Sequence, residues 1–97
     1  DSEQPRARML FAMMQRRRFD ISEGKLPAHQ SGVFSDHGQQ SVEYAYVISG
    51  SVTLRLGNET YELGEHDAIR FSSEVAHAYS TGDAPAILLT VVSYDDE

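Results

Sequence analysis

Residues 32–50, GVFSDHGQQSVEYAYVISG, decide the fold of this chain. They place His37, Gln39 and Glu43 directly before a run of β-branched and aromatic residues. Residues 66–81, HDAIRFSSEVAHAYST, form a second such stretch and carry His77. Because each stretch brings imidazole or carboxylate groups to a short strand, we expect these groups to meet inside a barrel whose wall is the rest of the chain.

The remaining pattern predicts short strands separated by turns. Alternating apolar residues, Gly57-Asn58 and the glycines at 50 and 64 are signals of strands and hairpins. A short helix is the competing prediction only for residues 8–15. We expect about eight strands in an all-β barrel or double-sheet jelly roll, over residues 8–15, 19–26, 42–48, 52–56, 60–63, 68–71, 77–80 and 86–94.

Length and composition indicate one domain over residues 1–97, with flexible ends at 1–7 and 95–97. The chain has no cysteine, which excludes disulfides, thiolate metal sites and cysteine nucleophiles and fits a reducing, cytoplasmic setting. No apolar run is long enough to cross a membrane. Because the chain begins at Asp1 rather than methionine, we expect a fragment of a longer parent.

The charge distribution argues against direct contact with nucleic acid. The net charge is −7, and residues 19–97 hold three basic against thirteen acidic side chains. Such a surface repels phosphate backbones. Arg16–Arg18 are expected to form a solvated turn.

The strand at 42–48 has two apolar faces. If Glu43, Ala45 and Val47 point inward, then Tyr44, Tyr46 and Ile48 point outward, because side chains alternate along a strand. An outer face of this kind needs a cover, either from the N-terminal strands or from a second subunit. We therefore expect a homodimer.

Residues 37, 39 and 43 are separated by even numbers, which places them on one face of an extended strand. With His77 they offer two imidazoles, a carboxylate and an amide oxygen. Two histidines and a carboxylate bind Fe(II), and zinc or manganese also accepts them. A metal held by His37, Glu43, His77 and Gln39 is one reading, and hydrogen-bonded histidines without metal are the other. Glu43 could instead pair with Arg55 or Arg70.

These residues resemble the two motifs of the cupins. The first family motif is Gly, five residues, His, one, His, three or four, Glu, six, Gly; here four residues separate Gly32 from His37, Gln39 replaces the second histidine, and Glu43 and Gly50 follow in register. In the second motif, His66, Ser72 and Glu74 replace Gly, Pro and Gly, whereas His77 is kept. We expect His66 at positive φ.

The phrases EYAYVISGSVTLRLGNETYEL and DAIRFSSEVAHAY are similar to the C-terminal cupin sensor domains of helix-turn-helix regulators of the XRE type. The resemblance, over about residues 9–94, implies a cupin-like double-stranded β-helix, an N-terminal DNA-binding domain in the parent and a barrel that binds a small effector. It also implies a divalent metal (zinc, iron, manganese or nickel) as a possible cofactor.

The function expected is therefore an effector-binding domain of a transcriptional regulator rather than an enzyme. A small metal-dependent oxygenase or isomerase that uses the same residues is the alternative, although the loss of a histidine at position 39 weakens it. The residues expected to contact the ligand are Gln39, Glu43, Arg55, Arg70, Phe71 and Tyr79. His29 and His66 are expected on surface loops.

Overall fold

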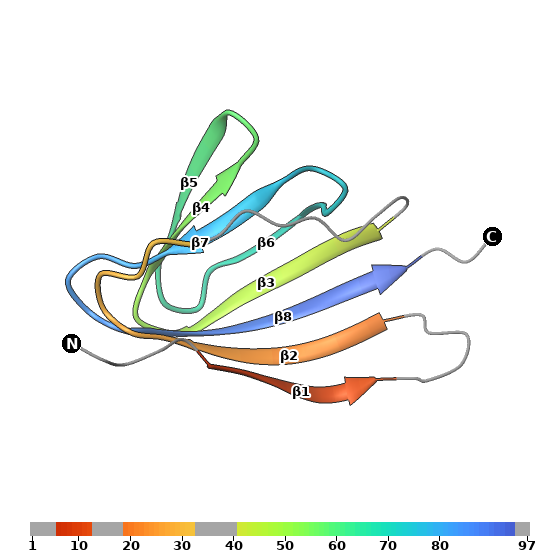
Figure 1. Cartoon of the computed structure of the whole chain (residues 1–97), viewed down its shortest axis with the longest axis horizontal. Coiled ribbons are helices and arrows are strands. Elements are labelled where there is room, and N and C mark those ends of the chain that lie inside the picture. The colour runs from red at the N-terminus through yellow and green to blue at the C-terminus, as the bar shows by residue number, and fades with distance from the viewer. Residues whose placement is uncertain (1–5, 13–18, 33–40, 95–97) are drawn as a thin grey trace.

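The computed structural model describes residues 6–12, 19–32 and 41–94, and for 6–12 it describes the backbone alone. These residues form eight strands and contain no helix (Figure 1). The strands are β1 (Arg6–Ala12), β2 (Phe19–Leu26), β3 (Ser41–Ser49), β4 (Val52–Leu56), β5 (Glu59–Leu63), β6 (Ala68–Ser72), β7 (His77–Ser80) and β8 (Ala86–Tyr94). In the described part of the chain, therefore, no helix could cross a membrane. The expected jelly-roll β fold is confirmed, and so is a strand rather than a helix near residue 8.

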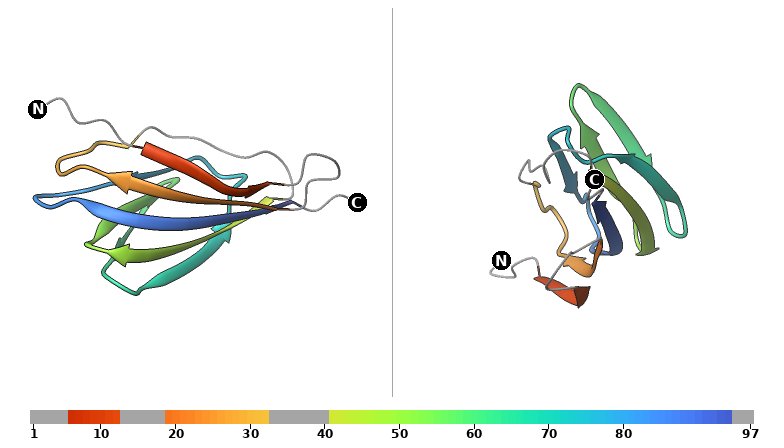
Figure 2. Two further views of the ribbon diagram at one scale, coloured as in Figure 1. Left: turned by 90° about the horizontal axis from the view of Figure 1, so that it is seen from below. Right: turned by 90° about the vertical axis from the view of Figure 1, so that its right-hand side faces the viewer.

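The strands form two antiparallel sheets (Figures 1 and 2). One sheet has the order β1-β2-β8-β3-β6 and the other has the order β5-β4-β7. β8 lies in the middle of the larger sheet, as its long apolar sequence predicts, and pairs with β2 along one edge and with β3 along the other. Strands that follow each other in the chain are often not neighbours in a sheet. Pairing between residues that are far apart in the sequence therefore holds the fold together.

Strict alternation on β3 gives the larger sheet an inner and an outer face. Glu43, Ala45 and Val47 are buried, whereas Tyr44 and Tyr46 are exposed. This confirms the predicted orientation of the strand. The pairing of β3 with β8 shifts register between Val47 and Ser49, so Ile48 lies at this irregularity and is only partly exposed.

The core fills the space between the two sheets. It consists of small and branched apolar side chains, of which Val47 and Leu54 have no exposed surface. Its members are Ala45, Val47, Val52, Leu54, Leu63, Phe71, Ala86 and Leu88. Burial of a Leu or Val side chain stabilises the fold by roughly 1.5–3 kcal/mol, so this cluster is the main source of stability.

Among the described residues, positive φ occurs at His29, Gly50, Gly57 and His66, and two of these positions shape the turns on either side of β5. Gly57 (φ 58°) opens the β4–β5 hairpin, while Asn58 does not share this conformation, which is the pattern of a turn with glycine in its first position. His66 has φ 73°, as expected for a residue that stands where the family motif has a glycine. The strained turn is held by backbone bonds, because His66 N donates to Val47 O at 2.7 Å and Asp67 N donates to Gly64 O at 3.0 Å.

Candidate functional site

Polar side chains are buried at one end of the barrel. Ser41 and Glu43 begin β3, Ser73 follows β6 and His77 begins β7, and none of the four is more than 2% exposed. Ser73 Oγ donates to Ser41 Oγ at 2.8 Å, so these two hydroxyls satisfy each other. The interior is therefore divided into an apolar region and a polar region. Ser41 and Ser73 are not among the predicted site residues; the even spacing of Ser41 from Glu43 is the signal that could have indicated the first.

The centre of the polar region is a pair formed by Glu43 and His77. His77 Nε2 lies 3.1 Å from Glu43 Oε1, and both side chains are 3% exposed. The two residues are 34 positions apart in the chain and come from different sheets. Since an isolated charge in such a place is costly, the pair must share a proton or a cation.

The surroundings of His77 fix its ring. Nδ1 lies 2.8 Å from Val75 O, and because a carbonyl oxygen can only accept, Nδ1 carries a hydrogen and donates it. The ring also meets Phe71 edge-on, with centroids 5.0 Å apart. Nε2 is therefore the nitrogen directed at Glu43, and with a proton on it the pair is an imidazolium and a carboxylate.

Tyr79 is hydrogen-bonded to the other carboxylate oxygen of Glu43. Its hydroxyl donates to Glu43 Oε2 at 2.5 Å, and its ring lies across His77 with centroids 6.3 Å apart. Burial, followed by the negative charge of Glu43 and the hydrogen bond to it, raises the pKa of the Tyr79 hydroxyl. The phenol therefore stays protonated and holds the carboxylate in one orientation.

The chemistry of this pair fits a divalent cation. Nε2 and Oε1 are nitrogen and oxygen donors of the kind that first-row metals bind, and Val75 and Tyr79 orient them as supporting hydrogen bonds commonly do at metal centres. Among the residues that the structure describes, no three His, Cys, Asp or Glu side chains gather in a metal-binding group. The other two expected ligands, His37 and Gln39, lie outside the described residues.

Two predicted ligand contacts do not lie in this cluster. Arg55 is exposed on β4, where Val52 and Leu54 point inward instead. Arg70 is exposed on the outer face of β6, where its Nε donates to Tyr44 Oη at 3.4 Å. Strand alternation thus directs both arginines away from Glu43, contrary to the expectation from the sequence.

The remaining predicted residues take the following places. Phe71 is 7% exposed and belongs to the core while its ring contacts His77. The side chains of His29 and His66 are 72% and 67% exposed, on loops as expected. His66 stacks on Tyr46 with centroids 6.1 Å apart, on the outer side of the sheet.

The first glycine of the motif has a steric role. A Cβ on Gly32 would lie 2.1 Å from the backbone oxygen of Tyr79, so only glycine lets the segment pass over β7 at this point. This contact places the chain that leads into residues 33–40 beside the strand that carries His77 and Tyr79.

Comparison with known proteins gives a family and a set of similar structures. A family model described as a cupin domain matches residues 23–92. A search of curated proteins gives no match. A helix-turn-helix (HTH_3 family) transcriptional regulator from Vibrio cholerae is 25% identical, with a TM-score of 0.85 over 95% of this chain and 52% of that one. This chain thus spans about half the length of that regulator.

Two further structures share the fold at lower identity. The cupin domain of an XRE family transcriptional regulator from Enterobacter cloacae is 22% identical, with a TM-score of 0.88 over 97% of this chain and all of that one. A DMSP lyase from Ruegeria pomeroyi is 21% identical, with a TM-score of 0.79 over 96% of this chain and 48% of that one. Since the family model covers most of the sequence and the fold agrees, the chain belongs to the cupin family and resembles the cupin domains of helix-turn-helix regulators.

Proposed function

We propose that this domain is the effector-sensing part of a helix-turn-helix transcriptional regulator, and that it binds a small polar molecule at the Glu43–His77 pair. The parent protein carries a DNA-binding domain before this segment and acts in the cytoplasm. The acidic surface of residues 19–97 leaves contact with DNA to that other domain. The similarity to regulators supports this assignment, while the lyase shares the fold alone.

The observation that carries the proposal is the buried cluster of Glu43, His77 and Tyr79. A small domain gains little stability from burying a carboxylate and an imidazole together, because removing both from water offsets their attraction. The cluster also lies at one end of the barrel rather than in the centre of the apolar core. Such an arrangement is expected where a ligand must be recognised.

A divalent metal is part of this proposal. Glu43 Oε1 and His77 Nε2 would hold it together with His37, and Gln39 would contribute a weaker oxygen or contact the effector. The metal would supply a positive charge that attracts an anionic or polar effector group. Phe71 and Tyr79 fix the positions of the two described donors, so the site is formed before the ligand arrives.

The domain acts as a homodimer in this proposal. Ligand binding would favour one arrangement of two copies over another and so move the attached DNA-binding domains. Glu43 faces the site and Tyr44, the next residue of β3, faces outward, so one strand connects the interior with the outer face.

The test is metal analysis and native mass spectrometry of the purified protein, repeated with His77→Ala and with His29→Ala as the control. His29 is a matched control because it is a loop histidine whose side chain is 72% exposed. We expect wild type and His29→Ala to retain the same metal or small molecule, and His77→Ala to lose it. Retention that is unchanged in His77→Ala would refute the site.

Turnover separates the sensor from a metal-dependent oxygenase or isomerase. The Glu43–His77–Tyr79 cluster contains groups that can hold or transfer a proton, which is the observation that favours an enzyme. The chain loaded in turn with Fe(II), Mn(II), Ni(II) and Zn(II) should bind its ligand without converting it. Catalytic conversion of the ligand that is lost in His77→Ala would instead identify an enzyme.

A further inference from the structure

We propose that Thr81 is a positioning residue of the effector site: its hydroxyl fixes residues 27–32 against the end of β7 and so sets where the chain continues toward His37. The inference rests on the proposed function, in which His37 is one of the metal ligands. Thr81 follows β7 directly and continues the even spacing of His77 and Tyr79. It therefore extends the strand that already supplies two groups of the site.

The Thr81 hydroxyl makes two hydrogen bonds to the backbone of this segment. Oγ1 donates to Pro27 O at 2.6 Å and accepts from Gln30 N at 2.9 Å. Pro27 comes directly after Leu26, where the pairing of β2 with β8 ends, so its carbonyl has left the sheet. Backbone groups that are withdrawn from water need a hydrogen-bond partner, and a hydroxyl can serve a donor and an acceptor at once. One side chain thus holds both ends of residues 27–30.

Backbone contacts complete the attachment. Thr81 N donates to Gln30 O at 3.0 Å, and His29 N donates to Gly82 O at 2.7 Å. At the end of the segment, Gly32 lies so close to the backbone of β7 that a Cβ would not fit. Figure 1 shows this segment turning back from β2 toward β7, so it joins the larger sheet to the smaller one.

The attachment acts on the site through a short connection. His37 is five positions after Gly32, and five residues reach at most about 18 Å. The place of Gly32 against β7 therefore limits the directions from which His37 can approach His77. Groups that orient a metal ligand without touching the metal typically contribute 10–100-fold to metal affinity. Since Thr81 acts through the backbone rather than on the imidazole itself, we expect an effect near the lower end of that range.

The test is isothermal titration calorimetry of the metal-free chain with Zn²⁺ alone, comparing wild type with Thr81→Val and Thr81→Ser. Valine keeps the shape of threonine but loses both side-chain hydrogen bonds, whereas serine keeps them. We expect Thr81→Val to bind Zn²⁺ on the order of tenfold more weakly and Thr81→Ser to bind it as wild type does. The backbone bonds remain in both variants, and circular dichroism must show that both are folded.

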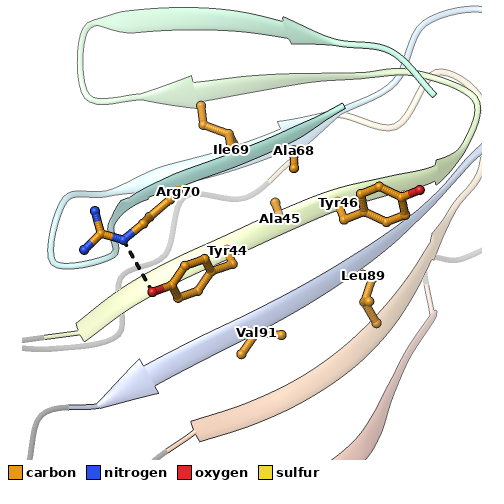
Figure 3. A pocket seen from close by; sticks show the side chains of 8 residues that line it. All are labelled: Tyr44, Ala45, Tyr46, Ala68, Ile69, Arg70, Leu89 and Val91. Atoms are coloured by element: carbon orange, nitrogen blue, oxygen red, sulfur yellow. Dashed lines mark hydrogen bonds between the residues drawn. The ribbon is translucent and has the colours of Figure 1, made fainter. Parts of the chain in front are cut away.

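Two controls remove a hydrogen-bonded hydroxyl that faces away from the site. Thr53→Val makes the same chemical change on β4, where Thr53 Oγ1 donates to Glu62 Oε1 at 2.9 Å. Tyr44→Phe alters the outer face of the larger sheet, where Tyr44 and Arg70 line a groove of about 290 Å³ (Figure 3). Both controls should bind Zn²⁺ as wild type does. Equal weakening in either of them would show that the effect is not specific to Thr81 and would overturn the inference.

A double-mutant cycle separates positioning from a general loosening of the fold. His37→Ala leaves Glu43 and His77 to hold Zn²⁺ more weakly, and in that background Thr81→Val should have little further effect, because the ligand that Thr81 positions is gone. The same tenfold loss in both backgrounds would contradict positioning, and so would a Thr81→Val variant with wild-type affinity. If His77→Ala weakens binding while Thr81→Val does not, only the role of Thr81 fails; binding unchanged in His77→Ala refutes the site itself.

Discussion

Replacement of Tyr79 by phenylalanine isolates one hydrogen bond of the buried cluster. The phenol donates to Glu43 Oε2, and Glu43 is 2% exposed. Phenylalanine removes only the hydroxyl. It keeps the ring, which packs against the core and makes an edge-to-face contact with the His77 ring. Glu43 then keeps its contact with His77 but loses the hydrogen bond from the Tyr79 hydroxyl. The substitution thus tests whether the phenol supports the carboxylate or merely lies near it.

The expected magnitude follows from burial. A hydrogen bond to a charged group contributes roughly 1.5–3 kcal/mol to stability, and at a buried site water does not replace the lost donor. We therefore expect Tyr79→Phe to lower the free energy of unfolding by about 2 kcal/mol. For a domain of this size, 1 kcal/mol corresponds to roughly 4–8 °C, so the Tm should fall by about 10 °C.

The assay is thermal and urea unfolding followed by circular dichroism at neutral pH. Tyr61→Phe is the matched control, because Tyr61 also donates its hydroxyl to a glutamate, Glu59, but on the exposed surface of β5. We expect no measurable change in that variant, since water replaces the lost partner. A Tyr79→Phe variant whose Tm equals that of Tyr61→Phe would refute the view that the phenol stabilises the Glu43 carboxylate.

Two further predictions concern the same part of the molecule. Gly32→Ala should destabilise the fold by about 2 kcal/mol or more in urea unfolding, because its Cβ would meet the Tyr79 carbonyl oxygen, whereas Gly82→Ala, with no atom within 4 Å, should be nearly neutral. Stability should also fall as the pH rises above about 10, since the raised pKa of Tyr79 means that the folded state keeps a proton that the unfolded chain releases. Below that pH the contribution is fully present, and the alkaline slope should be smaller in Tyr79→Phe than in wild type; equal slopes would contradict this assignment.

Much of the fold is determined by local sequence. The bounds of β2, β4, β7 and β8 agree with the predicted ranges, because alternation and the glycine and proline breaks are local signals. The inward direction of Glu43 also follows from its even spacing from Ala45 and Val47, because alternate residues of a strand share one face. The same rule could have placed the arginines: Arg55 alternates with Leu54 and Leu56, and Arg70 lies between Ile69 and Phe71, so both had to face away from the core.

Local patterns in the sequence are enough to predict which residues form strands and which face each side chain takes, since both depend on a two-residue period. They do not determine that Glu43 meets His77, that Tyr79 takes the second carboxylate oxygen, or that Tyr44 and Arg70 share one groove. These contacts join residues more than twenty positions apart in different strands, and only the order and register of strands in the folded sheets bring them together. Local alternation therefore selects the candidates, and long-range pairing decides which of them form the site.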